Sequence, residues 1–174
     1  MNITKLEKKD FESFFALMQE AFPPEEYRPK EKQYAILDDS NYSADVLIDN
    51  NEVRAFIATW KLDEFYFAEH LAVSSKLRNQ GIGSAFVKEY LELIQTPLVL
   101  EVENLTDSIS QRRIGFYERL GFILTDICYD QPNFQESGKR IPLRIMYHKN
   151  GQEFKTTRVK KEIFEKVYKK PLDE

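Results

Sequence analysis

The sequence predicts a layered α+β domain built on a mixed, mostly antiparallel sheet. The chain has 174 residues, of which 42% are hydrophobic, so it suits one domain with a substantial core. Turn-forming residues at 49–51 and 63–64 separate three strand-like segments, which should therefore pair as antiparallel neighbours. A strand-helix-strand unit follows from residue 65 to residue 103, and such a crossover requires one parallel pair of strands.

The first half of the chain supplies a short strand, two helices and the three antiparallel strands. After the strand at 3–6 comes a helix that Asp10 can cap and that Pro23 ends, because proline cannot continue a helix. Its apolar residues recur at helical spacing: Phe14, Phe15, Leu17, Met18, Ala21 and Phe22. We expect a short helix at about 29–37, and strands at 43–48, 53–61 and 65–73.

The second half alternates helices with strands. A helix at 81–94 ends before Pro97, and the apolar run at 98–103 predicts a strand buried on both faces. A helix at 108–120 stops at Gly121, a C-cap glycine. Strands at 122–127 and 143–148 close the sheet. The long excursion between them contains Tyr129, Pro132, Asn133, Phe134 and Gly138.

The end of the chain, residues 154–170, carries seven basic and two acidic residues. Val159, Ile163 and Val167 recur at four-residue spacing, which predicts an amphipathic helix. We favour a helix packed on the same domain with its lysines in solvent, and a basic element for phosphate or RNA is the alternative. The predicted organisation is a domain at 1–150 and this helix at 151–174.

Composition excludes several classes of function. The net charge of −4 disfavours a strongly basic nucleic-acid binder. One cysteine, Cys128, and two histidines, His70 and His148, exclude a disulfide framework and disfavour a zinc site. No apolar run approaches the ~18 residues of a membrane span, and the charged N-terminus is unlike a signal peptide, so we expect a cytoplasmic protein. Cys128 has no evident His or Asp partner and should be a buried, inert thiol.

The first two glycines of the chain, Gly81 and Gly83, lie between a predicted strand and a predicted helix, close to Arg78. Glycines let the backbone approach a ligand, and the first turn of a helix offers unpaired N–H groups, so this segment suits a phosphate. The Gly-x-Gly-x-x-Gly pattern of dinucleotide-binding folds is not met, because Phe86 stands at its third glycine position. The Gly-Lys-Ser/Thr ending of a P-loop is also absent. A turn that merely needs glycines remains the alternative.

Two blocks in this chain resemble the GNAT superfamily of N-acetyltransferases. The pattern Arg/Gln-x-x-Gly-x-Gly/Ala is met by Arg78, Gly81 and Gly83, and the segment 113–122 resembles the family's Tyr-x-x-x-Gly-Phe block at Tyr117. The resemblance covers about residues 2–148. It implies a three-layer GNAT domain at 1–150, with helices on both faces of a sheet that is splayed at its central parallel pair.

The resemblance also implies acetyl-coenzyme A as cofactor. Its pyrophosphate would be held around the glycine segment, by Arg78, Asn79, Gln80, Gly81, Ile82, Gly83 and Ser84. Its pantetheine arm would pair with the strand backbone at Leu71, Ala72 and Val73. One departure from the family is Ser110, where many members carry Asn, and it puts the wall of the pantetheine groove in doubt.

Direct transfer of an acetyl group to an amine needs a base, an oxyanion donor and an acid for the departing thiolate. Tyr117 matches the family's acid, with a core tyrosine as the alternative, and the Val73 N–H is the expected oxyanion donor. For the base we rank Glu69 first, Glu101 second and His70 third. Strand alternation would place Glu69 on the same face as Val73, with His70 on the opposite face.

The acceptor is expected to be a primary amine on a small molecule or a peptide. The excursion residues Tyr129, Asp130, Gln131, Pro132 and Phe134 would shape its pocket, and Glu25 and Glu26 could line the entrance or lie in a solvated loop. A non-catalytic acyl-coenzyme A-binding module that signals to a partner is the alternative function. We expect neither a nucleic acid nor a membrane as partner, and a homodimer stays open.

Overall fold

The computed structural model describes residues 1–103, 107–132, 134 and 141–172 of the chain. Within them, seven strands form one sheet in the order β1-β2-β3-β4-β5-β7-β6. Their bounds are β1 Ile3–Lys5, β2 Tyr42–Asp49, β3 Glu52–Lys61, β4 Tyr66–Val73, β5 Leu98–Glu103, β6 Ile123–Gln131 and β7 Ile141–His148. The predicted α+β class is confirmed, because β4 and β5 run parallel and all other neighbours run antiparallel.

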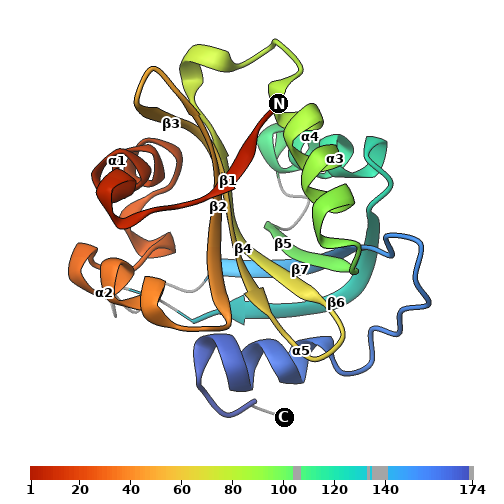
Figure 1. Cartoon of the computed structure of the whole chain (residues 1–174). Helices are drawn as coiled ribbons and strands as arrows, with labels where there is room; N and C mark the ends of the chain where they lie inside the picture. The colour runs from red at the N-terminus through yellow and green to blue at the C-terminus, as the bar shows by residue number, and fades with distance from the viewer. Residues whose placement is uncertain (104–106, 133, 135–140, 173–174) are drawn as a thin grey trace.

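The sheet is splayed between its two central strands (Figure 1). The parallel pairing of β4 with β5 begins at Tyr66 opposite Leu98 and ends at Ala68 opposite Leu100. Beyond this point the two strands separate, while β4 stays paired with β3 as far as Val73. Backbone groups on the β5-facing edge of β4 are therefore left without a strand partner.

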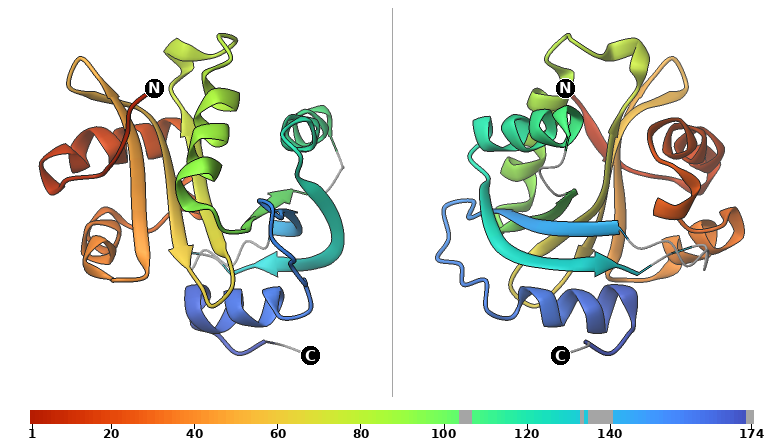
Figure 2. Two further views of the ribbon diagram at one scale, coloured as in Figure 1. Left: turned by 45° about the vertical axis from the view of Figure 1, so that its right-hand side comes forward. Right: turned by 180° about the vertical axis from the view of Figure 1, so that it is seen from behind.

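Helices cover both faces of the sheet (Figure 2). Helices α1 (Phe11–Ala21) and α2 (Lys30–Ala35) lie on one face, and α3 (Ile82–Ile94) and α4 (Ser108–Arg119) on the other. Each face has its own apolar core, one centred on α1 and the other on α3 and α4. Short 3₁₀ turns η1 to η4 lie at Lys8–Asp10, Pro24–Glu26, Ile36–Asp38 and Ser75–Leu77. Asp10 stands at the N-cap of α1 but makes no side-chain capping bond, contrary to expectation.

The C-terminal helix begins at Val159 and changes its geometry along its length. α5 (Val159–Glu162) continues as a π-helix, η5 (Ile163–Tyr168). Val159, Ile163 and Val167 are buried in the same core as the apolar face of α1. No helix in the described ranges is long and apolar enough to cross a membrane.

Two expectations about β6 are wrong. The strand extends to Gln131, so Tyr129, Asp130 and Gln131 belong to the sheet and not to a loop. Asn133 and Gly138, which we also placed in the excursion, lie outside the described residues. Cys128 is exposed, because β6 is the edge strand and its neighbour Tyr129 is the residue that turns toward the core.

Candidate active site

The gap between β4 and β5 opens into a cleft of about 640 Å³ that continues over the start of α3. Most of the residues predicted to hold the cofactor line it: Leu71, Ala72, Val73, Arg78, Asn79, Gly81, Ile82, Gly83 and Ser84. Gln80 does not line it, and its side-chain amide donates to the Lys76 carbonyl at 3.5 Å. Glu69, Glu101 and Tyr117 line the same cleft, so the predicted cofactor-binding residues and the predicted catalytic residues surround one cavity.

The α3 end of the cleft has the features of an anion site. Gly81 is the N-cap of α3 with φ 73°, a left-handed conformation that glycine adopts without strain, and no side chain caps the helix. The first intrahelical bond at this end runs from Ala85 N–H to the Gly81 carbonyl at 3.1 Å. The N–H groups of residues 82–84 therefore have no partner within the helix, and together with the helix dipole they favour an anion.

Gly83 lies in the first turn of α3, beside α4 and β4. A Cβ at this position would lie 3.5 Å from Cζ of Phe116 and 3.7 Å from Cγ2 of Val73. These are ordinary van der Waals distances, so a Cβ would fit at this position. Of the two glycines, only Gly81 has a backbone conformation that disfavours other residues.

The free edge of β4 offers further donors to the cleft. The Ser74 N–H points toward β3, because it donates to the Arg54 carbonyl at 2.7 Å. Successive backbone groups of a strand alternate in direction, so the N–H groups of Leu71 and Val73 point away from β3, toward the gap before β5. These are the positions expected to pair with a pantetheine chain and to supply an oxyanion donor.

A β-bulge at Glu69 changes the faces of β4. Ala58 of β3 pairs with His70 and Thr59 pairs with Ala68, so Glu69 is an extra residue in the strand. Glu69 and His70 both turn toward α1 and Arg28, whereas Leu71 and Val73 pack toward α3. The predicted simple alternation, with Glu69 and Val73 on one face, is therefore wrong.

Glu69 is paired with a buried arginine. Its two carboxylate oxygens accept hydrogen bonds from Arg28 at 2.7 and 2.8 Å, and the Glu69 side chain is only 1% exposed. Burial by itself would raise the pKa of Glu69, but the charge and hydrogen bonds of Arg28 lower it below the ordinary value. Such a carboxylate is a weak proton acceptor.

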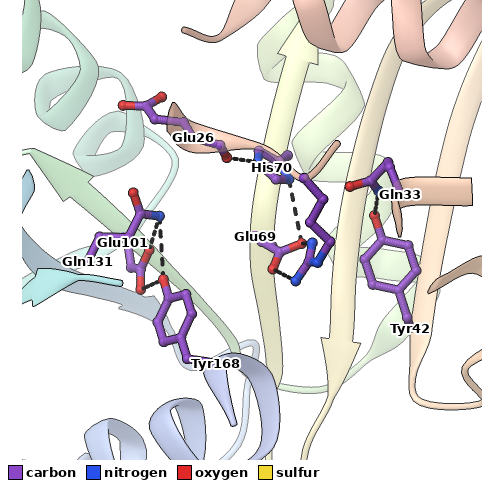
Figure 3. A network of polar contacts seen from close by, with 9 residues as sticks. Glu26, Gln33, Tyr42, Glu69, His70, Glu101, Gln131 and Tyr168 are labelled. Carbon is purple, nitrogen blue, oxygen red and sulfur yellow. Dashed lines mark hydrogen bonds and ion pairs between the residues drawn. The ribbon is translucent and has the colours of Figure 1, made fainter. Parts of the chain in front are cut away.

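Glu101 has tyrosine hydroxyls as partners in place of a cation, and Figure 3 shows the one from Tyr168. Its Oε1 accepts hydrogen bonds from the hydroxyls of Tyr129 and of Tyr168, the latter at 2.6 Å, and Gln131 Nε2 lies 3.4 Å from Oε2. Burial raises the pKa of Glu101 to about 7, although the two hydroxyls oppose that rise. Glu101 can therefore exchange a proton near neutral pH.

Tyr117 closes the cleft on the α4 side. It is 8% exposed, and its ring packs edge-on against Phe116 and Phe122. Its hydroxyl makes no hydrogen bond to any residue that the structure describes. Burial raises the pKa of Tyr117 to about 12, so the phenol keeps its proton at neutral pH and can donate it.

His70 is enclosed between aromatic rings. It is 4% exposed, packs edge-on against Phe22, and its Nε2 lies 2.6 Å from the carbonyl oxygen of Glu26. Burial lowers the pKa of His70, so the ring is neutral near pH 7. Glu26 belongs to η2, two residues before Arg28, and its neighbour Glu25 lies in the same 3₁₀ turn.

A second cavity has a volume of about 230 Å³. Its walls combine aromatic and basic side chains, among them Arg28, Trp60, Phe134, Tyr168, Lys169 and Lys170. Polar side chains form the partition between the two cavities. Arg28 and Tyr168 line the second cavity, and they bond Glu69 and Glu101, which line the cleft.

The sequence matches the profile of the Acetyltransferase (GNAT) family over residues 3–122. The chain belongs to this family. A solved structure of a GNAT-family protein from Bacteroides thetaiotaomicron superimposes with a TM-score of 0.85, at 30% identity over 97% of this chain and 98% of that one. An aminoglycoside 6'-N-acetyltransferase crystallised with coenzyme A shares the fold, with a TM-score of 0.64 and 16% identity over 89% of this chain and 100% of that one.

YjbC of Bacillus subtilis (strain 168), whose name describes an acetyltransferase, is 28% identical over 112 residues. That alignment covers 63% of this chain and 56% of YjbC, so the chain spans little more than half of that relative. The GNAT profile ends at residue 122, before β6. Two of the residues that surround Glu101, Tyr129 and Tyr168, therefore lie outside the matched segment.

Several cleft residues of this GNAT domain were missed from the sequence, among them Arg112, Arg113 and Phe116 of α4. Arg113 lies one helical turn before Tyr117, a spacing that could have revealed it. Ser110, the departure from the family pattern, is 5% exposed and does not line the cleft. Its N–H is bound by the Asp107 side chain at 2.7 Å, so it belongs to the helix cap.

Proposed function

We propose that this GNAT protein transfers the acetyl group of acetyl-coenzyme A directly to a primary amine of a small molecule or peptide. One observation carries the proposal: unpaired N–H donors, a carboxylate with a pKa near 7 and a protonated phenol all face one cleft. Acetyl-coenzyme A would supply the acetyl group and a thiolate leaving group. The N–H groups of residues 82–84, with Arg78 and Arg113 nearby, would hold its phosphates.

We assign the general base to Glu101, in preference to Glu69. Glu101 would take a proton from the amine, directly or through water, as the nitrogen attacks the thioester carbonyl carbon. The Val73 N–H would stabilise the negative charge that develops on the carbonyl oxygen. As the new C–N bond forms and the C–S bond breaks, Tyr117 would give its proton to the sulfur. Glu69, held by Arg28, would keep the partition between the two cavities rigid.

A screen for free thiol over a panel of primary amines and short peptides tests this assignment. We expect at least one acceptor to release coenzyme A and to gain the mass of one acetyl group. Glu101→Gln should lower kcat/KM by ~10²–10⁴-fold. Glu103→Gln is the matched control, since Glu103 lies two residues further along β5 and does not line the cleft. Coenzyme A binding by calorimetry without thiol release from any acceptor would instead indicate the non-catalytic binding module.

A further inference from the structure

The C-terminal helix reaches the candidate base from outside the segment that matches the family. We infer that Tyr168, the last residue of η5, is a positioning residue that holds Glu101 by its Oε1 and leaves Oε2 to accept the proton. The inference rests on the proposed role of Glu101. Its direct observation is the 2.6 Å hydrogen bond from the Tyr168 hydroxyl to Glu101 Oε1, between residues 67 positions apart in the chain.

The helix places this hydroxyl by packing. Ile163 is fully buried and Val167 is 5% exposed, so the helix is anchored on the core directly before Tyr168. The π-helix then ends at once, because Lys169 adopts φ 52° and the Lys170 N–H returns to the Phe164 carbonyl at 3.0 Å. Tyr168 itself is 9% exposed and packs against Phe134 and Phe164. Its ring is thus held on both sides, and the hydroxyl has a defined direction.

The two carboxylate oxygens of Glu101 have different hydrogen-bond partners. Oε1 accepts from both Tyr168 and Tyr129, whereas Oε2 has only Gln131 Nε2, at 3.4 Å, among the described residues. A carboxylate oxygen that already accepts two hydroxyl bonds is a poor site for a further proton. The proton from the amine should therefore go to Oε2.

Four titratable groups face Glu101 from the surrounding elements. They are Tyr129 from β6, Tyr168 from η5, Glu69 from β4 and Glu26 from η2. The two carboxylates disfavour the charged form of Glu101, and the two hydroxyls favour it. Removal of one hydroxyl should consequently raise the pKa of Glu101, which shifts proton acceptance to higher pH.

The test is a direct titration of Glu101 by ¹³C NMR of the carboxyl carbon, assigned with Glu101→Gln, in three forms of the full chain. Tyr168→Phe should raise the pKa of Glu101 by about one unit, since hydrogen bonds to charged groups are the stronger ones. Tyr90→Phe is the matched control: it also removes one buried hydroxyl, which bonds Thr59 at 3.0 Å, and neither residue is among the groups that act on Glu101. Tyr90→Phe should leave the pKa of Glu101 unchanged.

A pKa of Glu101 that differs by less than ~0.2 unit between wild type and Tyr168→Phe would overturn the inference. A shift that Tyr90→Phe reproduces would do the same, because it would mark a general loosening of the fold. The readout needs no acceptor, so it is separate from failure of the proposed function, which would appear as absence of thiol release. With an active acceptor, the rising limb of kcat/KM against pH should move by the same amount.

Discussion

Glu69 and Glu101 face one cleft from neighbouring strands, yet their proton affinities are driven in opposite directions. Arg28 lowers the pKa of Glu69, and burial raises the pKa of Glu101 to about 7. At the scale of single residues, such a difference in pKa distinguishes a structural carboxylate from one that can exchange protons during a reaction.

The raised pKa of Glu101 predicts a dependence of stability on pH. A group whose pKa is higher in the folded state contributes stability below its unfolded pKa and loses it as the pH rises through the folded value, here from about 4.5 to 7. Glu101→Gln should therefore match wild type near pH 4.5 and exceed it in free energy of unfolding by up to about 3 kcal/mol at pH 8. Urea unfolding at both pH values measures this difference. A constant difference at all pH values would contradict it.

Tyr117→Phe should separate catalysis from binding. The variant keeps the ring that packs against Phe116 and Phe122 but loses the proton that we assign to the leaving sulfur. Acid catalysis contributes ~10²–10⁴-fold, so turnover should fall by at least ~10-fold even if solvent partly replaces the phenol, while affinity for acetyl-coenzyme A changes little. Steady-state kinetics and calorimetry test both. Full turnover under conditions where chemistry limits the rate would make Tyr117 a core residue.

At the scale of elements, two local irregularities build the cleft. The bulge at Glu69 turns its side chain toward Arg28, and the divergence of β4 from β5 leaves the N–H groups of Leu71 and Val73 without strand partners. The start of α3 adds three more donors because Gly81 caps the helix without a side chain. Regular, fully paired elements would offer none of these groups to a ligand.

The two glycines of this element should respond differently to alanine. Gly81→Ala forces a side chain into φ 73°, which costs ~1–2 kcal/mol and disturbs the N–H groups that follow. Gly83→Ala has helical backbone and a nearest contact of 3.5 Å, so its stability should stay close to wild type. Thermal unfolding and coenzyme A titration of both variants provide the measurement. Equal losses of stability and of coenzyme A affinity in the two variants would argue against a special role for Gly81.

At the scale of the molecule, the C-terminal helix shares the core of α1. Buried residues from both, including Phe14, Phe15, Val159 and Ile163, form one cluster. Lys166 also forms salt bridges with Asp63, in the turn between β3 and β4, and with Glu162 of the same helix. This arrangement favours a helix that folds with the domain over a detachable basic tail.

Ile163→Ala should accordingly destabilise the whole domain. Ile163 is fully buried, and truncation of such a side chain costs ~2–5 kcal/mol. Lys161→Ala is the control, since its side chain is 61% exposed and should cost less than ~0.5 kcal/mol. Both transitions should remain two-state with one midpoint. A separate early transition for Ile163→Ala would mean that the helix unfolds independently.

The sequence by itself determined the α+β class, the parallel pair of strands, the glycine segment and the two GNAT blocks. These depend on short-range properties: turn residues at 49–51, proline and glycine at helix ends, and the period of apolar residues. The same local signals placed Gly81 at the start of α3 and Tyr117 within α4.

Only the tertiary structure decided which carboxylate carries a raised pKa, and why. Arg28 reaches Glu69 across 41 positions, and Tyr129 and Tyr168 reach Glu101 across 28 and 67. A bulge of one residue turned Glu69 away from its expected face, and the edge position of β6 exposed Cys128. The acid–base behaviour of a side chain depends on burial and on the charges a few ångströms away. Those neighbours come from distant parts of the chain, so the period and spacing of local sequence contain no information about them.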